Sequence, residues 1–227
     1  MKRYLLIVAV VFAAFCAVMP RAFAAESDAR EARDLVIKSR LAFEGFIADK
    51  NFTWFQENIK KAKAVLIFPQ VLKAGFFWGG SGGTGLLLVK DEKTGEWSEP
   101  AFYTIGSVTF GLQIGAEDAE VIMLAMSQKA IDSLYASSFK LGGDIAVAAG
   151  PYGAGVKKTV TADFISFAKA KGLYAGLSFE GSGVAVRDKL NKAYYGRSVS
   201  PLQIIVKHEV SNPASAELLS EVRKAVQ

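Results

Sequence analysis

In the N-terminal part of the chain, after the first 25 residues, hydrophobic and polar residues follow a helical spacing. Between residues 26 and 60, apolar residues recur on one face and charged residues occupy the other. The apolar set is Ala32, Leu35, Val36, Ala42, Phe43 and Phe46. Gly45 and Asn51 are expected to interrupt or bend this helix, so a short second helix is predicted from Phe52 to Lys60.

From residue 64 onward the pattern changes to short apolar runs separated by glycine. Val65 to Pro69 has the pattern of a buried strand closed by proline. Further strands are predicted near residues 74–80, 84–90, 100–114, 119–126, 143–150, 158–168, 172–179 and 183–187. A helix with Ser127 as its N-cap interrupts this region, and a C-terminal helix is predicted to begin at Asn212 and Pro213.

The glycines of this region have a structural explanation. Glycine weakens a strand unless the backbone needs a positive φ or another group lies too close for a side chain. Gly79, Gly150 and Gly176 are expected at such positions, and Gly95 is expected in a hairpin turn. The elements together predict an α+β fold. Its centre is a mainly antiparallel β-sheet or partly closed barrel, flanked by N-terminal, middle and C-terminal helices.

The first 24 residues have the pattern of a secretory signal peptide. Lys2 and Arg3 precede an apolar stretch from Tyr4 to Met19, and Ala22-Phe23-Ala24 has the spacing of a cleavage site. Residues 25–227 are then a single exported domain of the periplasm or cell envelope. A membrane anchor is the first alternative. A lipid-modified Cys16 is the second, although Phe15 stands where that processing needs a small residue.

Removal of the signal peptide changes the charge and the cysteine content. Lys2, Arg3 and Arg21 leave with it and no acidic residue does, so the net charge falls from +5 to +2. A nucleic-acid-binding domain would be much more basic. The one cysteine, Cys16, also leaves, so the exported domain has neither disulfides nor thiol chemistry.

The motifs that would carry catalysis are weak. Gly80 to Gly85 fits G-x-G-x-x-G, but an apolar strand follows it where a dinucleotide site needs a helix. His208 is the only histidine, which is too few for the usual zinc sites. Glu117, Asp118 and Glu120 could supply a carboxylate pair for a hydrolase, but surface charge explains them better. We therefore expect no enzyme, no cofactor and no metal.

One segment combines aromatic and basic residues. Trp54 and Phe55 precede Lys60, Lys61 and Lys63, a combination that suits the headgroup layer of an anionic membrane. These five residues are the predicted lipid-binding site. The alternatives are core packing for the rings and a solvated helix end for the lysines.

A resemblance to a known family covers most of the exported domain. The blocks that carry it are Phe68-Pro69, Lys73 to Phe76, Gly79 to Gly85, Trp97 to Pro100, Gly111 to Glu117, Ala148 to Pro151, Lys171 to Gly176 and Tyr194 to Gly196. In this order they resemble the SYLF-domain family of lipid-binding and actin-regulating proteins, in its bacterial exported branch. The resemblance implies a non-enzymatic domain. Eukaryotic members bind phosphoinositides through a basic N-terminal helix, whereas Glu31, Asp34 and Glu44 make this helix mixed in charge.

The sequence thus predicts a non-enzymatic envelope protein that binds anionic phospholipid or another amphiphile at a membrane surface. A periplasmic structural or interaction module with a protein partner is the alternative. If the lysines do not make the lipid contact, the glycine-rich segments around Gly82 and Gly181 are the next candidates.

Overall fold

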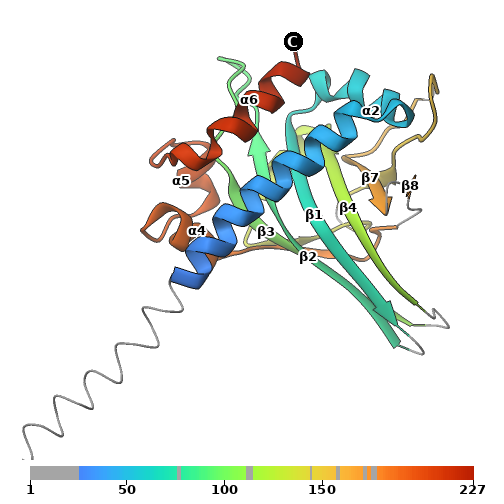
Figure 1. Ribbon diagram of the computed structural model, residues 1–227, viewed down its shortest axis with the longest axis horizontal. Coiled ribbons are helices and arrows are strands. Elements are labelled where there is room, and N and C mark those ends of the chain that lie inside the picture. The colour runs from blue at the N-terminus through green and yellow to red at the C-terminus, as the bar shows by residue number, and fades with distance from the viewer. Residues whose placement is uncertain are drawn as a thin grey trace, which may run out of the picture.

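A nine-stranded sheet with helices on both faces forms the centre of the fold (Figure 1). The computed structural model describes residues 26–75, 78–110, 115–143, 145–156, 159–170, 173–174 and 178–227. The predicted signal peptide, residues 1–24, and Gly176 lie outside the described residues. Within the described ranges, no helix is long and apolar enough to cross a membrane.

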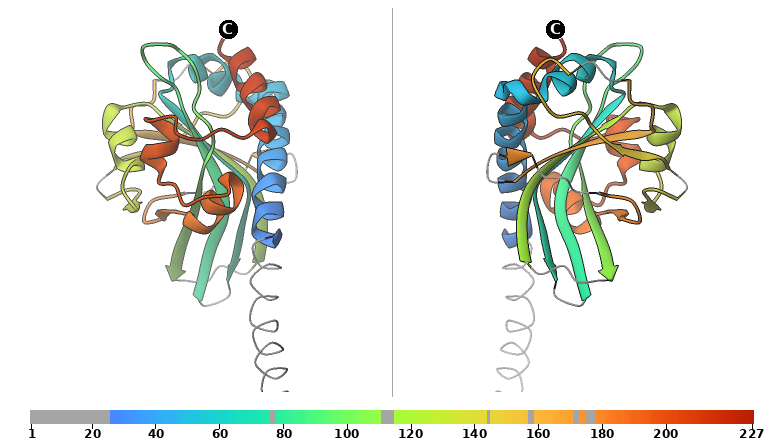
Figure 2. Two further views of the ribbon diagram at one scale, coloured as in Figure 1. Left: turned by 90° about the vertical axis from the view of Figure 1, so that its left-hand side faces the viewer. Right: turned by 90° about the vertical axis from the view of Figure 1, so that its right-hand side faces the viewer.

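The strands give the sheet a mainly antiparallel order. They are β1 (Ala64–Gly75), β2 (Trp78–Val89), β3 (Ala101–Phe110), β4 (Gly115–Ala125), β5 (Ser138–Lys140), β6 (Val147–Ala149), β7 (Phe164–Ala170), β8 (Leu173–Tyr174) and β9 (Gly183–Val186). The spatial order is β5-β9-β3-β2-β1-β4-β7-β6, with β8 paired to β7. Among the pairs of these described strands, only β6–β7 is parallel. The sheet is strongly curled (Figure 2). The predicted α+β class is confirmed.

Helices cover the sheet on its two faces. The N-terminal helix, residues 26–48, lies across one face and is followed by η1 (Lys50–Phe52), α2 (Thr53–Asn58) and η2 (Ile59–Lys61). The later helices are α3 (Gln128–Leu134), α4 (Asp188–Tyr195), α5 (Pro201–Ile205) and α6 (Ala216–Ala225), which follows η3 (Pro213–Ser215). The N-terminal helix, α2, α4 and α6 contribute to the core on one face, and α3 and α5 to the core on the other.

Strand β1 contributes to both cores because successive side chains point to opposite faces. Val65 and Ile67 lie under the N-terminal helix, whereas Leu66 and Phe68 lie on the opposite face, and all four are buried. The apolar stripe predicted for the N-terminal helix is confirmed, since all six of its residues are buried. Gly45 does not interrupt this helix, which continues to residue 48.

A β-bulge at Pro69 and Gln70 interrupts the regular pairing of β1. Ile67 lies opposite Leu86 of β2, but Val71 lies opposite Gly83, so β1 has one extra residue over this stretch. The same extra residue occurs against β4. A bulge releases one residue from the ladder, and proline, which has no N–H, fits there. The prediction that proline ends the strand was therefore wrong.

Close packing explains three glycines, two in β2 and one just after β6. A Cβ on Gly83 would lie 2.4 Å from the Gln70 carbonyl oxygen, and one on Gly85 would lie 2.3 Å from the Ile67 carbonyl oxygen. A Cβ on Gly150 would lie 2.1 Å from the Phe167 ring, which confirms the expectation for this residue. The glycines of β2 thus make room for the bulge of β1.

The sequence predicted the starts of two further helices and one turn, but it did not predict two other helices. Ser127 and Asn212 are N-caps as predicted, and Gly95 has the positive φ of a turn. Helices α4 and α5 were not predicted, although Ser200 and Gln203 form a capping box at the start of α5.

The bulge makes a prediction about stability. Gly85→Ala forces a methyl group against backbone and should lower the free energy of unfolding by about 1–3 kcal/mol. Gly82→Ala on the same strand is the matched control, because its Cβ would meet nothing closer than 3.7 Å. Chemical denaturation of the two variants checks this. If both unfold like the wild type, the bulge does not constrain β2.

Candidate functional site: a groove beside the N-terminal helix

The two aromatic rings of the predicted lipid site lie inside the protein. Trp54 is 7% exposed and Phe55 is fully buried, and both rings pack against Phe167 of β7. The helical turn that carries them points them into the core beneath the N-terminal helix. Their predicted contact with lipid is therefore corrected to core packing.

The three lysines of that site do remain at the surface. Lys60 and Lys61 are exposed at the end of η2, and neither forms a salt bridge within the described part of the chain. The ammonium group of Lys61 donates a hydrogen bond to the Asn58 side chain at 3.3 Å. Lys63 is half-buried and pairs with Glu92. Lys60 and Lys61, which form no salt bridge with a described residue, remain for a membrane contact without the two aromatic rings.

A groove lies where the N-terminal helix passes over the bulge of β1. It consists of two adjoining hollows of about 590 and 460 Å³, which share Lys38, Pro69 and Gln70. The wider hollow is completed by Leu41, Gly45, Asp118, Glu120 and Lys169. The narrower one is completed by helix residues that include Arg30, Glu31, Asp34 and Leu35, and by the strand residues Leu72, Gly82, Gly83 and Thr84. We call this feature the helix–bulge groove. From Arg30 to Gly45 the helix is about 22 Å long.

Small residues in the sheet keep the groove open. Leu72 of β1 lies opposite Gly82 of β2, which lies opposite Gly106 of β3, so no side chain covers Leu72 from that direction. Leu72 is 54% exposed and Leu41 on the helix is 53% exposed. Beyond the bulge the strands project past the helix (Figure 1). The groove therefore presents two leucines to solvent.

The charged residues of the wider hollow come from three elements and sum to zero. Lys38 belongs to the N-terminal helix, Asp118 and Glu120 to β4, and Lys169 to β7. One Asp118 carboxylate oxygen accepts a hydrogen bond from the Gln70 amide at 2.7 Å. The hollow thus holds two cations and two carboxylates beside its exposed leucine.

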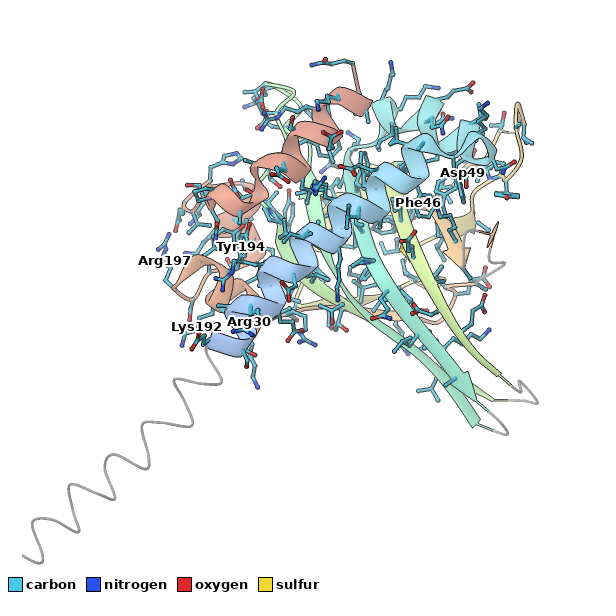
Figure 3. All side chains as sticks on the ribbon, in the orientation of Figure 1. Arg30, Phe46, Asp49, Lys192, Tyr194 and Arg197 are labelled. Atoms are coloured by element: carbon cyan, nitrogen blue, oxygen red, sulfur yellow. The ribbon has the colours of Figure 1, made fainter. Side chains whose placement is uncertain are left out.

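Lys169 and Glu120 lie directly opposite each other in the β4–β7 pair. The Lys169 ammonium lies 5.5 Å from the centre of the Phe46 ring and donates to the Gly45 carbonyl at 3.3 Å. Figure 3 shows Phe46 towards the end of the N-terminal helix that leads to Asp49, and Arg30 near the opposite end. A Cβ on Gly45 would lie 3.3 Å from this ammonium, so glycine in the helix gives the lysine room. Burial raises the pKa of the Glu120 carboxyl, although nearby Lys169 opposes that shift.

The residues considered for catalysis do not form one site. Glu117 lies on the opposite face of β4 from Asp118 and Glu120, because the three alternate along the strand. His208 is exposed and has a φ of 50°. Across the residues that the structure describes, no group of three His, Cys, Asp or Glu side chains could hold a metal ion.

Comparison with known proteins identifies the family. Residues 106–226 match the family model Ysc84, described as a Las17-binding protein actin regulator. The chain belongs to the Ysc84 family. This is the family that the sequence resemblance indicated under the name of its SYLF domain. The family description names a binding protein and an actin regulator, and no enzymatic reaction.

Several eukaryotic members of the Ysc84 family are similar over about 70% of this chain. An SH3 domain-containing protein of Schizosaccharomyces pombe is 33% identical over 164 residues, which are 69% of this chain and 38% of that protein. SH3 domain-containing YSC84-like protein 1 of Bos taurus is 31% identical over 72% of this chain and 49% of its own length. Protein YSC84 of Saccharomyces cerevisiae is 31% identical over 71% and 36%. The chain spans half or less of the length of these relatives.

The block Trp97 to Pro100, which carries part of the Ysc84 resemblance, has a structural role here. A Glu99 carboxylate oxygen accepts a hydrogen bond from the Ser215 hydroxyl at 2.7 Å, and the Pro100 carbonyl accepts one from the Tyr195 hydroxyl at 2.7 Å. Burial raises the pKa of the Glu99 carboxyl. These contacts tie the segment just before β3 to α4 and η3.

The groove makes a prediction about pH. The pKa of the Glu120 carboxyl is raised in the folded state, so ionisation of this group destabilises the fold. Its contribution to stability is therefore present at low pH and is lost as pH rises through the raised pKa. Glu120→Gln should therefore have a higher Tm than the wild type at pH 7, and the difference should shrink towards pH 4. Differential scanning calorimetry measures it. A Tm that falls at pH 7 and not at pH 4 would contradict this expectation, because it would show that the ionised carboxylate stabilises the fold.

Proposed function

We propose that this chain is a non-enzymatic module of the cell envelope that binds an amphiphile, such as a membrane lipid, in the helix–bulge groove. The observation that carries the proposal is the exposure of Leu41 and Leu72 beside a polar, charged hollow. Ligand sites combine apolar lining with a few placed polar groups, and volumes of several hundred Å³ are usual. An amphiphile has both parts in one molecule.

Membership in the Ysc84 family supports a binding role without choosing the ligand. The family is described through a protein partner, Las17, and through actin regulation. These words apply to the relatives, of which this chain spans half or less. The exported location is part of the proposal and rests on the apolar segment and cleavage site in residues 1–24.

Lys60 and Lys61 extend the proposal to a membrane surface. They are exposed and unpaired within the described residues, so anionic headgroups could replace water around them. Each lysine near such a surface contributes about 1 kcal/mol, which supports weak and salt-sensitive docking rather than anchoring. In this arrangement the lysines bring the protein to the membrane and the groove takes the ligand.

The groove can be tested with a lipid that carries a single acyl chain. The double variant Leu41→Glu, Leu72→Glu places two charges against the apolar part of a ligand and should weaken binding of monomeric lysophospholipid at least about tenfold. Titration calorimetry below the micelle concentration measures this affinity. Leu202→Glu is the matched control, because Leu202 is exposed on α5 and does not line the groove.

The lysines give the complementary control in the same experiment. Lys60→Glu, Lys61→Glu should reduce sedimentation with phosphatidylglycerol vesicles and leave monomeric lysophospholipid affinity unchanged. If the wild type binds neither vesicles nor lysophospholipid, the amphiphile proposal is wrong. The protein-partner module, which the Las17-binding description of the family favours, then takes its place.

A further inference from the structure

The charges of the helix–bulge groove indicate which kind of headgroup it suits. In the wider hollow, Lys38 and Lys169 line the wall together with Asp118 and Glu120, so the hollow has no net charge. An anionic headgroup would be attracted by the two lysines there and repelled by the two carboxylates. A headgroup that carries one positive and one negative group matches the hollow better, because each of its charges finds the opposite sign nearby.

Both charge types in the hollow have unused hydrogen-bonding capacity. The Glu120 carboxylate is half-buried and accepts no hydrogen bond from any described residue. The Lys169 ammonium makes one long hydrogen bond, to the Gly45 carbonyl, and has no carboxylate within 4.0 Å among the described residues. Partly buried charges with unused hydrogen-bonding capacity are unfavourable, so a ligand that supplies the missing hydrogen bonds gains affinity.

The number of donors on the positive group distinguishes the common zwitterionic headgroups. A primary ammonium has three N–H donors for carboxylates such as Glu120 and Asp118. A quaternary ammonium has none, and proteins hold it with aromatic side chains. No aromatic residue is among the described residues that line the two hollows. The lining therefore suits an ammonium that donates hydrogen bonds.

We propose that the helix–bulge groove selects phospholipids whose headgroup combines a phosphate with a primary ammonium, as in phosphatidylethanolamine. The phosphate lies between Lys38 and Lys169, and the ammonium lies against Glu120 and Asp118. The acyl chain leaves past Leu41 towards Leu72. This inference rests on the proposed function, since it names the ligand class of the same groove.

Three lysophospholipids with one acyl chain length separate the headgroup inference from the proposed function. Lysophosphatidylethanolamine should bind at least about tenfold more tightly than lysophosphatidylcholine and lysophosphatidylglycerol in titration calorimetry below the micelle concentration. Equal affinities for the three lipids overturn the headgroup inference and leave amphiphile binding intact. Binding of none of them overturns the proposed function itself.

Two isosteric variants then test the role of the carboxylate. Glu120→Gln should lower the affinity for lysophosphatidylethanolamine to that for lysophosphatidylcholine, and should leave the latter unchanged. Glu117→Gln, on the other face of the same strand, should keep the preference. Lys169→Met should lower the affinity for all three lipids by a similar factor, because all three carry the phosphate. Circular dichroism confirms that each variant is folded. A preference that survives Glu120→Gln contradicts the assigned geometry.

Discussion

The bulge at Pro69 and Gln70 is the constraint on which the rest of the structure depends. It lies in β1, which pairs with β2 on one side and β4 on the other, so one extra residue changes the pairing of three strands at once. Positions 83 and 85 require glycine because the backbone of β1 at the bulge leaves no room for a side chain there. The bulge also places Pro69 and Gln70 in the floor of the groove. The bulge at Pro69, a residue that the sequence pattern placed at the end of the strand, therefore shapes the candidate site.

The two faces of the sheet are covered to different extents. On the face of α3 and α5, alternate strand residues form an apolar core. On the face of the N-terminal helix, the same pattern gives a core as far as the bulge, and beyond it the pattern changes to Leu72, Gly82, Gly106 and charged residues. The bulge shifts the alternation of β1 by one residue, so Phe68 and Val71 both lie on the face of α3 and α5, and beyond it the covering helix does not follow the strands. The exposed leucines and the charged residues of the wider hollow lie at this boundary.

Elements with local signals could be predicted from the sequence. The apolar stripe of the N-terminal helix and the N-caps Ser127 and Asn212 depend on residues a few positions apart, and they hold in the structure. Trp54 and Phe55 could not be placed, since only tertiary packing against Phe167 decides whether a ring beside lysines is buried. The groove joins Lys38, Gln70, Glu120 and Lys169 from four distant segments, so no local pattern reveals it.

The position of a bound ligand tests the account most directly. A lysophosphatidylethanolamine with a nitroxide on its acyl chain broadens the amide signals of nearby residues in the NMR spectrum of the ¹⁵N-labelled protein. The account predicts the strongest broadening at Leu41, Leu72 and Gly82, with little effect at Lys60 and Lys61. Broadening confined to the lysine end, or spread evenly over the protein, would contradict a ligand site at the helix–bulge groove.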